Sequence, residues 1–327
     1  KKAFFFIIFS SFLFSRECLV DVSLQTRSNR PEKDTLAICL PSGHFYIHYD
    51  TTGSAAPDLT DLDVNGIPDY VDEVCMIADS SHHVLVDILG YNEEPFDGEG
   101  GYDIYIMSYA AGMYGFNYHE SAGTSYMRID NDYTGYDSYF GLSPIKIMQI
   151  TVGHEYFHGI QWGYRFSLAG NAYFYEMTSM WFEDILIPDG NDYIDPGYLS
   201  DPSDGWAEEL LDNPTASFDN TGNGYELALF GHYLSSFIDT SGAIDINNTT
   251  IIREIWERFG SSSSNAFSAV KYVLDGEKYS LTFIEAWVDF ITRNLYNGYY
   301  NSMDNPYYYY IDQDSPALVE LNQKNYH

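Results

Sequence analysis

Basic residues are scarce in this 327-residue chain, where 15 Lys and Arg face 48 Asp and Glu and leave a formal net charge of −33. Such a surface repels phosphate backbones and anionic lipid, so we set aside nucleic-acid binding and electrostatic docking to membranes. Disorder is excluded as well, because 45% of the residues are apolar and 17% are aromatic. The length allows one large domain or two modest ones.

Cysteines and long apolar runs are also few. Three cysteines make no disulfide framework, although Cys39 and Cys75 could either pair in an oxidising compartment or remain buried thiols. An apolar run at residues 3–14 follows two lysines and is too short to span a bilayer. We therefore predict that residues 1–17 form a secretory signal, with a buried N-terminal strand as the alternative. The mature chain is then secreted, extracellular or periplasmic, and free of the membrane.

The sharpest motif is His154-Glu155-Tyr156-Phe157-His158, an HExxH sequence within an apolar helical pattern. Histidines four residues apart lie on one face of a helix, so both imidazoles can bind one zinc ion. Glu155 lies near the open coordination position, where a carboxylate can take a proton from a zinc-activated water. Two core histidines satisfied by hydrogen bonds are the plain structural alternative.

Zinc requires a third ligand from the protein. The extension HExxHxxGxxH is absent, because Gln161 and Tyr164 stand at its glycine and histidine positions. Glu176, in the first turn of the next predicted helix, completes an HExxH-x17-E pattern and is the favoured ligand. Glu183 lies two turns further along the same face, where its carboxylate could accept a hydrogen bond from a zinc-binding histidine. Alternatively, Glu183 and Asp184 lie on a solvated or locally ion-paired helix face.

Two stretches carry a family resemblance: HEYFHGIQ at 154–161 and EMTSMWFED at 176–184. HExxH followed by Glu176 resembles the gluzincin metallopeptidases, the thermolysin-like clan. More closely, the stretches resemble secreted bacterial metalloproteases with HE-aromatic-FH-xxQ and E-x-T-[AS]-x-W-x-ED motifs, over about residues 61–297. The resemblance implies zinc bound by His154, His158 and Glu176, with Glu155 as the base. It also implies a Tyr or His that stabilises the oxyanion, for which Tyr225 and His232 are candidates; packed helix residues are the alternative.

A second motif, DLDVNGIPDYVD at 61–72, has the spacing of a calcium-binding loop. Oxygen ligands recur at loop positions 1, 3, 5, 9 and 12, and a glycine at position 6 permits a sharp reversal. The predicted calcium ligands are Asp61, Asp63, Asn65, the carbonyl of Ile67, Asp69 and Asp72. A solvated acidic turn that caps a helix is the alternative. Weaker candidates for a second ion are Asp97, Glu99 and Asp103, and also Asp130 and Asp132.

The order of the elements predicts an α+β fold. Alternating apolar residues predict strands at 44–49, 102–107 and 125–129, and helical spacing predicts helices at 70–90, 145–164, 172–187, 224–239, 249–259, 263–275 and 280–297. We expect a mixed β-sheet part at 35–165, with the calcium loop and the HExxH helix. A mainly helical part at 166–300, with the third zinc ligand, follows, and an irregular Tyr-rich tail occupies 301–327. The active-site cleft is expected between the two parts.

These features predict a secreted, calcium-stabilised zinc endopeptidase whose partner is a protein or peptide substrate. Two alternatives remain open at this point. One is a calcium-dependent extracellular binding or surface protein with a structural or vestigial zinc site. The other is a zinc hydrolase that acts on non-peptide substrates.

Overall fold

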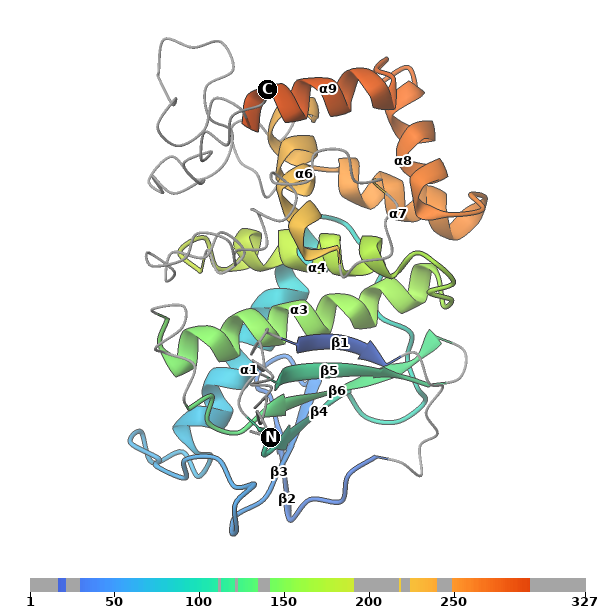
Figure 1. Ribbon diagram of the computed structural model, residues 1–327. Helices are drawn as coiled ribbons and strands as arrows, with labels where there is room; N and C mark the ends of the chain where they lie inside the picture. The colour runs from blue at the N-terminus through green and yellow to red at the C-terminus, as the bar shows by residue number, and fades with distance from the viewer. Residues whose placement is uncertain are drawn as a thin grey trace, which may run out of the picture.

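A mixed six-stranded sheet and a set of helices build the protein (Figure 1). The computed structural model describes residues 17–21, 30–110, 113–120, 123–134, 142–190, 218, 224–239 and 249–294. The strands are β1 (Glu17–Asp21), β2 (Thr35–Ile38), β3 (Phe45–Tyr49), β4 (Tyr102–Met107), β5 (Met113–His119) and β6 (Ser125–Asp130). Their order across the sheet is β1-β5-β6-β4-β3-β2. The β2–β3 and β5–β6 pairs are antiparallel, and the other three pairs are parallel.

Helices α1 (Asp69–His82) and α3 (Pro144–Tyr164) pack against the sheet. Strand β3 shows why, because its alternate residues Phe45, Ile47 and Tyr49 are buried and form the apolar face that the helices cover. Helix α1 continues into the π-helical segment η2 (His83–Ile88). The predicted single helix at 70–90 therefore changes its winding after His82.

Helix α3 lies between the sheet and helix α4 (Ala172–Leu186) (Figure 1). Beyond α4 come the segments η4 (Tyr225–Leu227), α6 (Ala228–Tyr233), η5 (Leu234–Ile238), α7 (Ile251–Ser261), α8 (Ala266–Asp275) and α9 (Phe283–Asn294). A helix packed on both sides is buried all round, and residues 147, 148 and 150–162 of α3 are all buried. Any polar side chain within that stretch therefore needs a partner in the interior.

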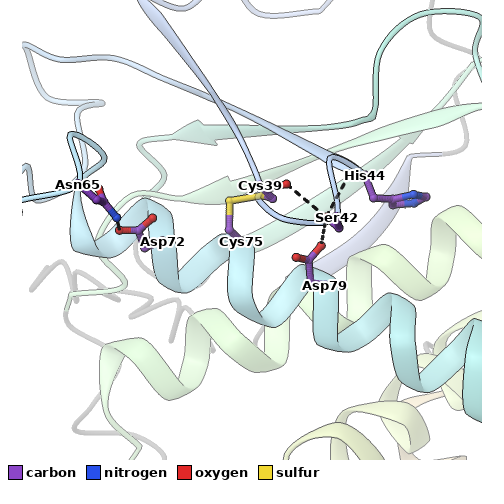
Figure 2. The surroundings of a disulfide bond; sticks show 7 residues. All are labelled: Cys39, Ser42, His44, Asn65, Asp72, Cys75 and Asp79. Atoms are coloured by element: carbon purple, nitrogen blue, oxygen red, sulfur yellow. Dashed lines mark hydrogen bonds between the residues drawn. A yellow bond between two sulfur atoms is a disulfide. The ribbon is translucent and has the colours of Figure 1, made fainter. Parts of the chain in front are cut away.

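A disulfide joins Cys39, directly after β2, to Cys75 in the middle of α1 (Figure 2). Beside it the hydroxyl of Ser42 donates to Asp79 of α1 at 2.7 Å, and the backbone N–H of His44 donates to Ser42 at 3.1 Å. Of the two possibilities left open by the sequence, pairing is the one that the structure shows. The cross-link fixes the β2–β3 turn on α1.

The predicted α+β composition is confirmed at the level of a mixed sheet plus helices. The expected strands at 44–49, 102–107 and 125–129 correspond to β3, β4 and β6, whereas β1, β2 and β5 were not predicted individually. The expected helix at 224–239 is divided into η4, α6 and η5. Strand β1 begins at Glu17, the last residue of the predicted signal; residues 1–16 and the tail at 301–327 lie outside the described residues. Within the described part of the chain, no helix has the length and apolar character needed to cross a membrane.

Candidate metal centre

The centre is built on α3 and α4, which pack against each other. Ser143 is the N-cap of helix α3, because its side chain accepts a hydrogen bond from the N–H of Lys146 and Pro144 occupies the first helical position. Ten residues later His154 and then His158 point from one face of α3 toward α4. Helix α4 presents Glu176 from its first turns.

Three ligand atoms converge at this interface. The Nε2 atoms of His154 and His158 are 3.1 Å apart, and Oε2 of Glu176 lies 3.1 Å from the first and 3.5 Å from the second. Tetrahedral zinc with bonds of about 2.0 Å separates its ligands by about 3.3 Å, so the triangle has the dimensions of a zinc face. The two histidines are fully buried and Glu176 is 6% exposed. The structure therefore brings together the three residues that the sequence indicates, in a group able to hold a metal ion.

The other ring nitrogen of each histidine also has a partner. Nδ1 of His154 lies 2.5 Å from Oε1 of Glu183, and Nδ1 of His158 lies 2.7 Å from Oε1 of Gln161. A carboxylate can only accept, so Nδ1 of His154 carries a proton toward Glu183. Without a metal its Nε2 is protonated toward Glu176 in the same way, and a metal ion would take the place of that second proton. Glu183 thus has the histidine contact expected from its position. Gln161 belongs to the HEYFHGIQ stretch and stands where the HExxHxxGxxH extension has its glycine, but the sequence predicts no contact between Gln161 and His158.

The electrostatics of the centre favour a positive charge. Burial by itself lowers the pKa of His154, but its hydrogen bonds with Glu176 and Glu183 outweigh burial and raise that pKa to about 10. Burial by itself raises the pKa of Glu176, yet the charges and hydrogen bonds of the two histidines lower it to about 2. The negative charge of Glu155 acts on His154 in the same direction. A cation at the centre balances this buried negative charge.

Glu155 lies at the contact between α3 and strand β5. Its backbone carbonyl accepts a 2.7 Å hydrogen bond from the amide of Asn117, whose Oδ1 in turn accepts from Trp162 at 2.9 Å. At Gly115 an added Cβ would lie 2.7 Å from Thr151 and 3.2 Å from Cγ of Glu155, so a larger residue would push β5 away from the helix. No local sequence pattern marks Gly115 and Asn117, because their role depends on the packing of β5 against a helix that is distant in the sequence.

Tyr225 lies at the centre, and His232 contacts a residue of α4. The ring of Tyr225 is 6.2 Å from that of His154 between centroids, edge-on, and Tyr225 is buried. Nε2 of His232 lies 3.6 Å from Oδ2 of Asp184. Burial lowers the pKa of His232 to about 3, so its ring is neutral at physiological pH. Tyr225, one of the two oxyanion candidates, thus packs edge-on against a residue of the metal group.

The calcium-type loop brings three of its carboxylates together. Oxygen atoms of Asp61, Asp63 and Asp69 lie within 4.8 Å of one another. Gly66 has a φ of +90°, the left-handed conformation that the sharp reversal requires. Its N–H donates to Asp61 at 2.9 Å, so the loop wraps inward around that carboxylate.

The other predicted ligands of the loop lie beside this group. The amide of Asn65 donates to Asp63 at 3.1 Å and to Asp72 at 2.9 Å, which ties the loop to the first turn of α1. The N–H of Ile67 donates to Oδ1 of Asn65 at 2.7 Å. Figure 2 shows the Asn65–Asp72 contact one turn before the disulfide. The loop is thus closed by its own hydrogen bonds around the acidic group.

The weaker expectation of a second ion at Asp97, Glu99 and Asp103 is wrong for two of these residues. The guanidinium of Arg30, whose side chain is 8% exposed, pairs with Asp97 at 2.8 Å and with Asp103. It also forms a bidentate pair with Glu120. The positive charge at this site is therefore that of Arg30, which is 67 residues before Asp97 in the sequence.

Asp130 is likewise occupied by backbone donors. It accepts hydrogen bonds from the N–H of Tyr109 at 2.8 Å and from the N–H of Tyr133 at 3.1 Å. Asp132 accepts from the N–H of Thr134 at 2.8 Å. These carboxylates therefore hold a turn after β6.

Comparison of the chain with models of protein families and with curated proteins finds no match.

Proposed function

We propose that this protein is a secreted zinc endopeptidase stabilised by calcium. One observation carries the proposal: the buried Nε2 atoms of His154 and His158 and an oxygen of Glu176 converge with the dimensions of a zinc face. Glu155 lies on the same helix between the two histidines. A purely structural zinc site has no need of a general base, so the presence of Glu155 supports catalysis.

Each residue of the site would have a different role in peptide hydrolysis. A zinc ion held by the three ligands would supply the Lewis acid that activates a water molecule and polarises the scissile carbonyl. Glu155 accepts a proton from the attacking water as the water oxygen bonds to the carbonyl carbon. It passes that proton to the amide nitrogen as the C–N bond breaks. The hydroxyl of Tyr225 donates a hydrogen bond to the carbonyl oxygen as negative charge develops there.

The proposal includes the position of the substrate. Helix α3 lies between the sheet and α4, and η4 brings Tyr225 to the same centre from the C-terminal helices. We therefore place the peptide-binding cleft where the mixed N-terminal part meets the helical C-terminal part. Asn117 and Gly115 support this arrangement by holding β5 close to Glu155.

We propose calcium as the ion of the loop at 61–72. The grouped oxygens of Asp61, Asp63 and Asp69 are the ligand type that calcium prefers, and the left-handed Gly66 belongs to the motif. The loop ends at the start of α1, which carries Cys75. Calcium would therefore stabilise the fold and take no part in hydrolysis.

Secretion is part of the same proposal. A disulfide between Cys39 and Cys75 persists in an oxidising compartment, and the strongly acidic composition suits a protein that remains soluble outside the cell. The partner is then an extracellular protein or peptide substrate, with no role for nucleic acid or membrane.

Burial of the centre favours a second candidate function. Glu155 is fully buried, whereas the general base of an endopeptidase must meet a peptide substrate. A closed centre also suits a binding protein with a structural zinc ion, or a hydrolase of small non-peptide substrates. The two functions differ in whether Glu155 is needed for turnover.

The test compares casein cleavage by the wild type and by Glu155→Gln, both loaded with zinc and calcium. We expect both proteins to hold one zinc per chain and the variant to lose turnover by several orders of magnitude, because only the base has been removed. Glu285→Gln, the same change at an exposed position of α9, is the matched control and should cleave casein normally. Equal turnover in Glu155→Gln would refute the mechanism, and zinc binding without cleavage by any variant would favour the second candidate.

A further inference from the structure

The two histidines of the metal centre are held by chemically different partners. Nδ1 of His154 faces the carboxylate of Glu183, whereas Nδ1 of His158 faces the neutral amide of Gln161. An amide has an oxygen that accepts and a nitrogen that donates, so Gln161 could in principle hold His158 in either tautomer. The tautomer that Gln161 holds determines whether Nε2 of His158 carries a lone pair that can bind a metal or a hydrogen that cannot.

We propose that Gln161 is a positioning residue that fixes the Nδ1–H tautomer of His158 and so keeps its Nε2 available for the metal. The inference rests on the proposed metal site. It assigns to the amide of Gln161 the role that the carboxylate of Glu183 has toward His154. Gln161 itself touches neither metal nor substrate.

The surroundings of Gln161 determine which way its amide points. Its Nε2 lies 3.1 Å from the backbone carbonyl of Tyr175, 3.0 Å from the hydroxyl of Thr178 and 3.1 Å from that of Ser179. A carbonyl oxygen can only accept, so a reversed amide would set two acceptors against each other in a fully buried site. The nitrogen therefore faces α4, and Oε1 faces His158.

The hydroxyl of Thr178 strengthens the same assignment. Its proton is directed to the carbonyl of Phe174 at 2.9 Å, one turn earlier in α4. It is then left to accept from Gln161 and from the indole N–H of Trp256 at 3.2 Å. A reversed Gln161 would leave this hydroxyl without one of its donors. The chain of contacts runs from α7 through α4 to the metal ligand.

The alternative partner of His158 is weaker. The hydroxyl of Ser179 lies 3.3 Å from Nδ1, farther than Oε1 of Gln161 at 2.7 Å. Without Gln161, Ser179 could either accept from Nδ1 or donate to it, so it leaves the tautomer undecided. Removal of Gln161 should thus free the proton of His158 to occupy either ring nitrogen.

The test uses the full chain and the variant Gln161→Met, which keeps a similar side-chain length without either polar group. Zinc affinity is measured by competition with a chelator, and we expect a loss of 10- to 100-fold. The matched control is Gln149→Met on the same helix, because Gln149 also donates its amide, to Glu73 of α1, away from the metal group. We expect its zinc affinity to stay within twofold of the wild type.

A second measurement reports the tautomer directly and needs no activity. In ¹⁵N-histidine-labelled, metal-free protein near pH 8, two-bond ¹H–¹⁵N spectra should show the Nδ1–H form of His158 in the wild type and a mixture in Gln161→Met. An Nε2–H form of His158 in the wild type would overturn the proposal even if the variant failed to fold. So would unchanged zinc affinity in a folded Gln161→Met. A wild type that shows the Nδ1–H form but neither binds zinc nor cleaves casein would instead refute the proposed function and leave the tautomer assignment standing.

Discussion

Substitution of Gly224 by alanine should destabilise the fold and displace Tyr225. Gly224 has a φ of +84° and precedes η4, the short segment that delivers Tyr225 to His154. A Cβ at this position would lie 2.5 Å from Cα and 2.7 Å from C of Tyr173, which are backbone atoms with little freedom to move. Gly224 thus has a left-handed backbone conformation and lies so close to the backbone of Tyr173 that no side chain fits between them.

The two effects can be given separate magnitudes. A left-handed conformation costs an L-residue roughly 1–2 kcal/mol, and overpacking of a buried contact costs roughly 1–3 kcal/mol. Gly224→Ala should therefore lower the free energy of unfolding by about 2–5 kcal/mol. Gly170 provides the control, because its φ is +77° but an added Cβ would meet nothing within 4 Å. Gly170→Ala should lose only the conformational part, about 1–2 kcal/mol.

Urea unfolding of the two variants beside the wild type measures both effects. We expect Gly224→Ala to be the less stable variant by at least about 1 kcal/mol. Under the proposed mechanism, its turnover number should also fall about 10- to 100-fold under folding conditions, because a displaced Tyr225 could not donate to the substrate carbonyl. Equal losses of stability in the two variants would show that the contact with Tyr173 carries no energy. Normal turnover in a folded Gly224→Ala would show that catalysis does not depend on the placement of Tyr225.

Three further predictions concern the part of the molecule around the sheet. Reduction of the Cys39–Cys75 disulfide, or Cys75→Ser, should lower the free energy of unfolding by about 4 kcal/mol, the loop-closure value for a separation of 36 residues. Urea unfolding with and without dithiothreitol measures this loss, and a loss below about 1 kcal/mol would contradict the prediction. Burial by itself lowers the pKa of His44, but its 2.7 Å hydrogen bond with Glu94 outweighs burial and raises that pKa. The stability that His44 contributes is therefore fully present below about pH 6.5 and is lost as the pH rises through the folded pKa. The difference in unfolding free energy between wild type and His44→Gln should shrink as the pH rises, and a difference that grows with pH would contradict the argument. Arg30→Leu removes the guanidinium that three nearly buried carboxylates share, although Asp103 keeps its 2.6 Å contact with His48. We expect the free energy of unfolding in urea to fall by about 3–5 kcal/mol. An unchanged stability would show that these carboxylates do not depend on Arg30.

The candidate metal centre was predictable because the helical periodicity of the sequence puts its residues on facing helices. His154 and His158 share a helix face by their spacing alone, and Glu176 is the fifth residue of the next helix, which follows after a short connection. Both helices have strong apolar patterns, so their existence and approximate bounds follow from the sequence. Glu183 also follows, since it lies seven residues after Glu176 on the same face.

Residues that act through distant packing were not predictable. Strand β5 contains Gly115 and Asn117, which are poor strand formers, and both of its faces are largely buried, so it lacks the alternation of a half-exposed strand. Arg30 reaches acidic residues 67 to 90 positions away, a pairing that composition does not encode. Gln161 stands in the motif itself, yet its role depends on acceptors in α4 that only the packed structure places.

The proposal that His154, His158 and Glu176 bind one zinc ion is tested most directly by zinc X-ray absorption on the purified protein. We expect one zinc per chain with two imidazole nitrogens and one carboxylate oxygen at about 2.0 Å, and a water oxygen in the remaining position. His158→Ala should lose this signature together with most of the bound zinc. A protein that binds no zinc when it is supplied, or that keeps the same coordination after His158→Ala, would contradict the assignment of these residues as the metal site.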